Sequence, residues 1–224
     1  MKYSIAIVLL FICSECFCSN AIPQKFVVLD EKGEKLSNIV VEISAVSANN
    51  AISSNPKKAQ EVAAKPAVME QAGKQFLPHI LLIAKGQEVV FPNTDHVIHH
   101  VYSFSPAKKF QLTLKKEVTS DPIKFDDVGI VELGCNVHDW MLGYIYASNA
   151  DTFGQTALDG ELAFDLLPGE YTVSVWHPRL AEQDIEKRFG FTIDATSKIH
   201  EITLTHPIYP SLIGYDTVEA TDAY

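Results

Sequence analysis

The stretch from Cys135 to Met141 constrains most strongly what this chain of 224 residues can be. It places a thiol (Cys135), an imidazole (His138) and a thioether (Met141) within seven residues. A second segment, residues 95–102, lies about forty residues upstream and contains three further histidines. Thiolate and thioether are soft ligands that suit Cu(I), and imidazole suits both common oxidation states of copper. The two segments together therefore predict a copper site.

The spacing of the three residues favours a loop over a straight strand. Successive side chains of a strand point to opposite faces, so one strand cannot direct all three donors at one point. We expect Cys135 to end a strand, and the chain to turn back through His138 to Met141. The second imidazole then has to come from a neighbouring strand. A Cys-His-His plane with a weakly bound axial Met is the arrangement found in blue-copper electron-transfer sites.

Residues 1–21 have the pattern of a secretory signal peptide. Lys2 supplies the positive charge, residues 5–13 are apolar, and small residues occupy positions 19–21. The apolar run is too short to span a bilayer, so we expect no membrane span after signal removal. An uncleaved anchor and a lipid attachment at Cys13 are the alternatives. The pattern predicts a periplasmic or otherwise exported protein.

Removal of the signal peptide would change the cysteine content of the chain. Cys13, Cys16 and Cys18 leave with it, and Cys135 remains as the only thiol of the mature chain. One thiol cannot form an internal disulfide, and a free thiol in an oxidising compartment is a liability. Metal ligation gives a reason to keep it, and an inert buried cysteine is the alternative.

The charge of the chain excludes one class of partner. The formal net charge is −10 at pH 7, and the signal peptide contributes Lys2 and Glu15, which cancel. Nucleic-acid binding requires basic patches, so we expect no nucleic acid partner. The charge fits a basic protein partner attracted over several ångströms, although solubility alone explains it equally well.

Short apolar runs separated by turn residues predict an all-β protein built from antiparallel sandwiches. We expect a first domain over residues 22–148, with a hairpin at 24–46 and a flexible, exposed insert at about 47–66. A smaller β module follows at 149–207. Residues 208–224 form a polar tail.

Residues 86–147 resemble the cupredoxins, the family of plastocyanin, amicyanin and pseudoazurin, and the plastocyanin-like proteins labelled methylamine utilisation proteins. Three motifs carry the resemblance: the run from Gly86 to Asn93, the segment His99-His100-Val101, and Gly134-Cys135-x-x-His138-x-x-Met141. The resemblance implies a Greek-key β-sandwich that holds one copper ion cycling between Cu(I) and Cu(II).

The resemblance also implies roles for residues. His99, Cys135 and His138 would hold the copper in a plane, with Met141 as a weak axial ligand. The protein would be an electron carrier and not an enzyme, with a cytochrome or dehydrogenase as its redox partner. His100 stands where the family usually has an asparagine that ties the ligand loop by hydrogen bonding.

Residues 149–205 resemble the transthyretin-like modules found beside carboxypeptidases. The turn at Asp159-Gly160, the run from Leu167 to Tyr171 and the alternating strand from Val173 to Trp176 carry this resemblance. Such modules are small β-sandwiches, usually without catalysis.

Several alternatives remain open at the level of sequence. His100 or His96 could replace His99 as the ligand, or the three histidines could form a second metal site. Met141 could be a core residue only. The function could be copper storage or delivery, or the metal site could be structural in a β module.

The sequence contains further candidate functional residues. A nucleophilic Cys135–His138 pair is disfavoured because nothing in the sequence supplies an oxyanion hole. Trp140 is expected at the rim of the ligand loop, where it could dock a partner or shield the metal. His177 reads as a strand-end residue without a metal role. We expect the remaining scattered histidines on the surface, namely His79, His200 and His206.

Overall fold

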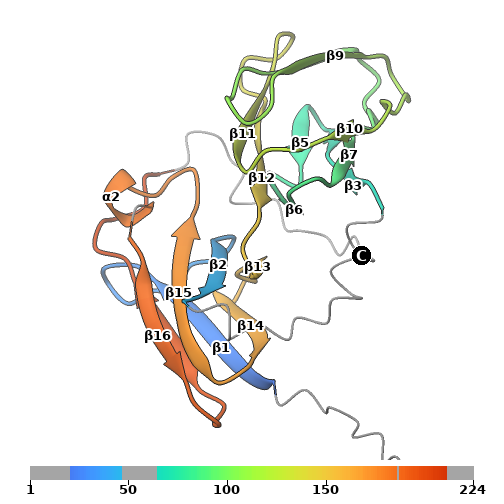
Figure 1. Cartoon of the computed structure of the whole chain (residues 1–224). Coiled ribbons are helices and arrows are strands. Elements are labelled where there is room, and N and C mark those ends of the chain that lie inside the picture. Colours follow the sequence, from blue (N-terminus) through green and yellow to red (C-terminus); the bar gives the residue numbers. More distant parts are fainter. Residues whose placement is uncertain (1–20, 47–64, 186, 211–224) are drawn as a thin grey trace, which may run out of the picture.

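A computed structural model describes residues 21–46, 65–185 and 187–210, and their regular secondary structure is almost entirely β-strand (Figure 1). The all-β prediction is therefore confirmed. The predicted signal peptide, most of the predicted insert and most of the tail lie outside the described residues. No helix within the described ranges is long and apolar enough to cross a bilayer.

The described residues form two packed units. The first, which we call the ligand unit, spans residues 65–148. Its strands are β3 (Ala67–Val68), β4 (Glu70–Ala72), β5 (Gln75–Leu77), β6 (Ile80–Ala84), β7 (Glu88–Val90), β8 (His99–Ser103), β9 (Phe110–Leu114), β10 (Ile123–Lys124), β11 (Gly129–Cys135) and β12 (Leu142–Ser148).

The ligand unit is a sandwich. One sheet has the strand order β6-β12-β11-β8-β9, a smaller sheet has the order β10-β7-β3, and β4 and β5 form a separate hairpin. Residues from both sheets and the hairpin share one core, including Val131 and Leu133 of β11, Val89 of β7 and Phe76 of β5. The core therefore lies between the sheets, as a cupredoxin-like sandwich requires.

Period-two alternation brings the candidate ligands into this core. In β11 the side chains of Val131, Leu133 and Cys135 are buried, with the residues between them more exposed. In β8 the side chains of His99 and Val101 are buried in the same way. Because Cys135 pairs directly with Val101 in the antiparallel β11–β8 ladder, Cys135 and His99 lie on the same face two positions apart.

The second unit combines the two ends of the described chain. It contains β1 (Ile22–Leu29), β2 (Val40–Ala45), β13 (Thr152–Gln155), β14 (Glu161–Leu166), β15 (Gly169–Trp176), the short helix α2 (Glu182–Ile185), β16 (Phe189–Ile193) and β17 (Ile199–Thr203). Its two sheets have the orders β14-β1-β17 and β13-β2-β15-β16. In Figure 1 the blue strands β1 and β2 lie among the orange strands of this unit.

This pairing corrects two predictions. Residues 22–46 do not belong with the ligand unit, and β1 and β2 do not form a hairpin, because they lie in different sheets. Phe26, Val27 and Val28 are all almost fully buried, so β1 needs a neighbouring strand on each side and a covered face. The strands β14 and β17 provide those neighbours.

The two units meet at a small apolar cluster. Val40, Ile80 and Trp176 are buried there, and Tyr144 and Tyr146 of β12 pack against Trp176, with ring centroids 5.7 Å and 5.1 Å away. Next to this cluster the Glu42 carboxylate accepts hydrogen bonds from the hydroxyls of Ser148 and Ser174. The cluster and these hydrogen bonds join β12, which follows the ligand loop, to the second unit.

His200 differs from the surface position expected for it, whereas His177 directly follows the end of a strand, as expected. His200 is buried, stacks on Phe26 at 4.9 Å between ring centroids, and lies 2.9 Å from Gln24 Oε1. His177 is also buried, where its Nδ1 accepts a hydrogen bond from the Arg179 amide. Burial lowers the pKa of His177 to about 3, with Arg179 and His79 contributing. His177 is therefore a neutral packing residue at the end of β15.

Candidate metal centre

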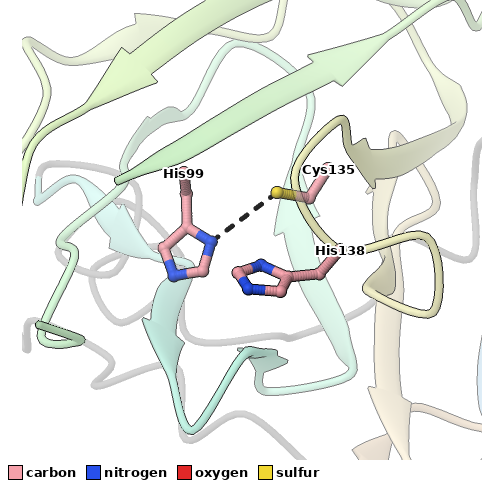
Figure 2. Close-up of side chains that lie close together, drawn as sticks. All are labelled: His99, Cys135 and His138. Carbon is pink, nitrogen blue, oxygen red and sulfur yellow. Dashed lines mark hydrogen bonds between the residues drawn. The ribbon is translucent and has the colours of Figure 1, made fainter. Parts of the chain in front are cut away.

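Three of the predicted ligands converge in the ligand unit. One potential ligand atom from each of His99, Cys135 and His138 lies within 4.8 Å of the others, and all three residues are buried. Figure 2 shows the two imidazoles and the thiol directed toward one another. His99 begins β8, Cys135 ends β11, and His138 lies in the loop before β12. The loop thus places the His138 imidazole beside His99 and Cys135, which the β8–β11 ladder already holds together.

Backbone hydrogen bonds fix the ligand loop. The Met141 amide donates to the His138 carbonyl at 2.9 Å and closes a tight turn. The Asn136 amide donates to the His100 carbonyl at 3.1 Å and joins the loop to β8. The main chain therefore ties the loop to β8. The His100 side chain itself is exposed.

The structure separates the candidate histidines. His96 and His100 are exposed and do not join the cluster, whereas His99 is fully buried within it. Met141 is 1 % exposed and belongs to the same core cluster as Cys135. The structure thus brings His99, Cys135 and His138 together and buries Met141 near them, and a ligand role for each of the four stays a prediction.

Asp95 contacts the ring nitrogen of His99 that lies opposite the one near the thiol. Its Oδ2 lies 2.8 Å from His99 Nε2, and the opposite ring nitrogen, Nδ1, lies 3.6 Å from Cys135 Sγ. Partial burial acts to raise the pKa of Asp95, but hydrogen bonds from the Lys74 amide, His99 and the Gly73 amide outweigh it and lower that pKa. The ionised carboxylate can only accept, so Nε2 carries the proton and Nδ1 offers a lone pair.

His138 offers the second imidazole nitrogen. Its Nδ1 is buried and has no hydrogen-bond partner. Burial lowers the pKa of His138, and the nearby His99 and Lys74 lower it further. A neutral ring with an unpartnered buried nitrogen is costly unless something binds that nitrogen. A metal ion would satisfy it.

The donor set fits copper. A deprotonated Cys135 would supply a soft sulfur, and the Nδ1 atoms of His99 and His138 would supply two imidazole nitrogens, a combination that serves both Cu(I) and Cu(II). All three residues are buried, which would limit the access of water to a bound ion. The residues present therefore fit the group that the sequence predicts.

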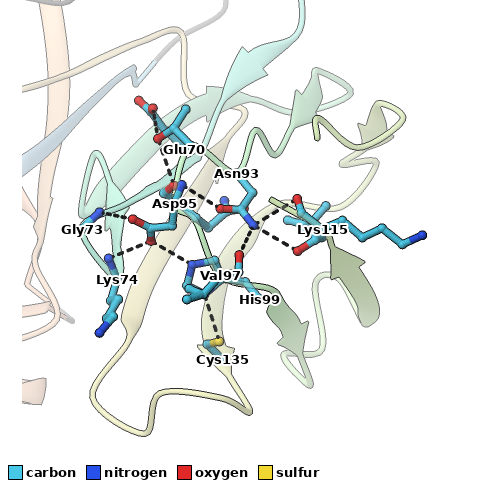
Figure 3. Close-up of polar contacts among 12 residues, drawn as sticks. Glu70, Gly73, Lys74, Asn93, Asp95, Val97, His99, Lys115 and Cys135 are labelled. Carbon is cyan, nitrogen blue, oxygen red and sulfur yellow. Dashed lines mark hydrogen bonds and ion pairs between the residues drawn. The ribbon is translucent and has the colours of Figure 1, made fainter. Parts of the chain in front are cut away.

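Sequence reasoning missed Asp95 and Asn93 as parts of the site. The Asn93 side-chain amide donates to the carbonyls of Val97, Leu114 and Lys115, and its oxygen accepts from the Asp95 amide (Figure 3). The available signal was Asp95, whose carboxylate lies four residues before His99. That spacing places two side chains next to each other in a helix, but no helix is present here. The turn that brings them together depends on distant carbonyls.

Apolar side chains surround the opening of the site. Trp140 is 50 % exposed, and its ring centroid lies 5.3 Å from that of His138. Val97, Ile98 and Val137 are also exposed on the two segments that carry the ligands. The rim position predicted for Trp140 is confirmed. We call these four residues the apolar rim.

A groove opens on another side of the ligand loop, beside Cys135 and Met141. Its other lining residues include Tyr102, Phe104, Glu132 and Asp139. Two of these four are acidic and two are aromatic, and no Lys or Arg lines the groove. This side of the site therefore presents negative charge to an approaching molecule.

No protein-family model matches the sequence, and no curated protein matches it. Solved structures similar to the chain include the copper-containing nitrite reductase of Thermus scotoductus SA-01, which is 23% identical over 38% of this chain, with a TM-score of 0.36. The match spans about a quarter of the reductase, 23% of its length.

Two smaller proteins are also similar. The purple cupredoxin of Nitrosopumilus maritimus is 23% identical over 37% of this chain and 99% of its own, with a TM-score of 0.32. A reduced amicyanin mutant is 21% identical over 48% of this chain and 99% of its own, with a TM-score of 0.34.

Proposed function

We propose that this protein is a type 1 copper protein that carries single electrons between redox partners. The observation that supports this most directly is the buried convergence of His99, Cys135 and His138, with ligand atoms within 4.8 Å of one another. When bound there, copper would supply one-electron chemistry between Cu(I) and Cu(II). We assign the Met141 thioether as the weak axial ligand because Met141 is buried beside Cys135.

The surrounding structure supports a site that changes little between two oxidation states. His99 and Cys135 are held by paired strands of one sheet, and His138 is held by the loop hydrogen bonds to Met141 and β8. Such a preorganised frame keeps both nitrogen donors and the sulfur in place whether or not an electron is present. Small reorganisation is what fast electron transfer requires of the protein.

We propose that partners dock at the apolar rim. The rings of His138 and Trp140 are neighbours, with centroids 5.3 Å apart, so a protein that contacts Trp140 comes within a short distance of a ligand ring. The net charge of −10 and the acidic groove favour a partner with a basic surface, of the cytochrome or dehydrogenase kind. Export to the periplasm, expected from residues 1–21, would place both proteins in one compartment.

One geometric feature favours a second candidate, nucleophilic catalysis. Cys135, His99 and Asp95 are arranged as a thiol, an imidazole and a carboxylate in a row, the order of a catalytic triad. However, the Cys135 residue is only 4 % exposed, and a triad gives no role to the unpartnered Nδ1 of His138. Metal ligation explains both the burial of Cys135 and the unpartnered Nδ1 of His138, so we prefer it to nucleophilic catalysis.

The experiment is the visible spectrum of the purified protein loaded with Cu(II). The proposal predicts an intense thiolate-to-copper band that disappears in Cys135→Ser, together with repeated oxidation and reduction without loss of metal. A colourless protein that binds Zn(II) equally well would favour a structural metal site. A colourless protein with a thiol that reacts rapidly with iodoacetamide would favour the nucleophile.

A further inference from the structure

The hairpin formed by β4 and β5 is linked to His99 of the metal centre by the side chain of Asp95. Its turn residues Gly73 and Lys74 both have φ near +60°, so the two successive amides point the same way. Both donate to the Asp95 carboxylate, at 2.7 Å to Oδ1 and 2.9 Å to Oδ2. Figure 3 shows Asp95 between this turn and the His99 ring.

The conformation of Lys74 is informative because it is strained. A non-glycine residue in the left-handed region costs about 1 kcal/mol or more and persists only where the surroundings enforce it. The hairpin is fastened at further points, since Thr94 bonds to Glu70 and to the Gln71 carbonyl. The turn is thus held in the conformation that directs two amides at one carboxylate.

We propose that Asp95 is a positioning residue that selects the Nε2-protonated tautomer of His99 and so presents its Nδ1 lone pair to the metal. This inference rests on the proposed copper site, which it extends to the neighbouring residues. The carboxylate receives three donors, two from the hairpin turn and one from His99. An anionic acceptor on a ligand histidine also raises the basicity of the ring, which favours Cu(II) over Cu(I).

An asparagine at this position cannot reproduce these contacts. Oδ2 of Asp95 accepts from both Lys74 and His99, while Oδ1 accepts from Gly73. An amide would leave one NH₂ group facing one of these N–H donors, whichever way it is flipped. Asp95→Asn therefore keeps the shape of the side chain while losing both the charge and one acceptor. Asp95→Ala removes all acceptors.

The first readout uses the metal-free protein. Nitrogen NMR shifts of the His99 ring, at about pH 8, distinguish the two neutral tautomers. We expect the wild type to be protonated at Nε2 only and Asp95→Ala to show a mixture. Asp139→Asn is the matched control, because it removes one exposed negative charge beside His138 without touching His99. Its His99 tautomer should equal that of the wild type.

The second readout is metal binding. We expect Cu(II) affinity to fall about 10- to 100-fold in Asp95→Ala, to a smaller extent in Asp95→Asn, and less than about twofold in Asp139→Asn. A tenfold greater loss for Cu(II) than for Cu(I) corresponds to a rise of about 59 mV in reduction potential. If Asp95→Ala fails to fold, Asp95→Asn carries the metal-binding measurement, because it loses the charge and one acceptor.

The measurements distinguish a failure of this inference from a failure of the proposed function. A folded Asp95→Ala protein with the wild-type tautomer and wild-type Cu(II) affinity, or an Asp95→Asn protein with wild-type Cu(II) affinity, overturns the inference and leaves the copper proposal intact. A wild-type protein that binds copper without a thiolate band overturns the proposed function. The tautomer measurement, which needs no metal, still decides the role of Asp95 in that case.

Discussion

The ring of Tyr102 lies directly over Gly134, the residue that precedes Cys135. A Cβ atom at position 134 would meet Tyr102 Cζ at 2.5 Å and the Tyr102 hydroxyl at 2.6 Å. The two residues face each other across the β11–β8 ladder, and Phe104 packs against the outer side of Tyr102, with ring centroids 5.1 Å apart. The strand end that carries the thiol is thus covered by the far end of the Tyr102 side chain, which occupies the space that Gly134 leaves open.

Gly134→Ala should therefore disturb the metal centre. The added methyl forces either Tyr102 or the end of β11 to move, and such overpacking costs about 1–3 kcal/mol. We expect a lower free energy of unfolding and a shifted visible band in the copper-loaded protein. Gly190→Ala is the control, because a Cβ there meets nothing within 4 Å. Rescue by Tyr102→Ala in the double variant would identify the clash, and equal behaviour of the two alanine variants would refute it.

Met141→Leu tests the axial ligand assignment. Leucine preserves the buried volume but cannot donate to a metal, so the thiolate band should persist while the reduction potential rises. The direction follows because an additional donor stabilises the more highly charged Cu(II). Each tenfold change in the ratio of Cu(II) to Cu(I) affinity moves the potential by about 59 mV. Cyclic voltammetry measures it, and an unchanged potential would assign Met141 to packing alone.

The two tryptophans should behave in opposite ways. Trp176 is 5 % exposed at the junction of the two units, so Trp176→Ala should lower the free energy of unfolding by about 3–5 kcal/mol with little change in the visible spectrum. Trp140→Ala, at a half-exposed position, should leave stability nearly unchanged and slow electron transfer to a protein partner. Chemical denaturation and stopped-flow kinetics measure the two effects. A destabilised Trp140→Ala protein would contradict the rim assignment.

His177 should make the metal-free protein less stable at low pH. Burial lowers its pKa to about 3 in the folded state, whereas an unfolded histidine titrates near 6.5. Below pH 6.5 the unfolded chain binds a proton that the folded chain does not, so stability falls as the pH decreases from about 6.5 toward 3. The loss from this residue at pH 5 is about 2 kcal/mol relative to neutral pH.

Urea unfolding at pH 7.5 and pH 5 checks this expectation. The stability difference between the two pH values should shrink by that amount in His177→Gln. It should not shrink in His96→Gln, where the histidine side chain is 88% exposed. If His177→Gln retains the full wild-type pH dependence, another buried group is responsible.

The candidate site could be predicted from sequence largely because its donors are local or adjacent. Cys135, His138 and Met141 share one loop, and the only step beyond it was the choice among His96, His99 and His100. Alternation favours His99, because β8 buries His99 and exposes His100. His96 lies before the strand and is exposed.

The placement of residues 22–46 could not be predicted in this way. The pattern of β1 indicates a buried strand, but a strand pattern does not specify its partner. Phe26 pairs with Leu162 and with His200, which are both more than 130 residues away along the chain. The same limit applies to Asp95, whose partners in the β4–β5 turn lie more than 20 residues earlier. Non-local pairing decides both cases.

X-ray absorption of the copper-loaded protein tests the central claim most directly, because it counts the donors around the ion in both oxidation states. We expect one short copper–sulfur bond and two copper–imidazole bonds in the Cu(II) form, with the same set retained in the Cu(I) form. A spectrum that shows only nitrogen and oxygen donors, or that loses the sulfur on reduction, would contradict the assignment of His99, Cys135 and His138 as a redox copper centre.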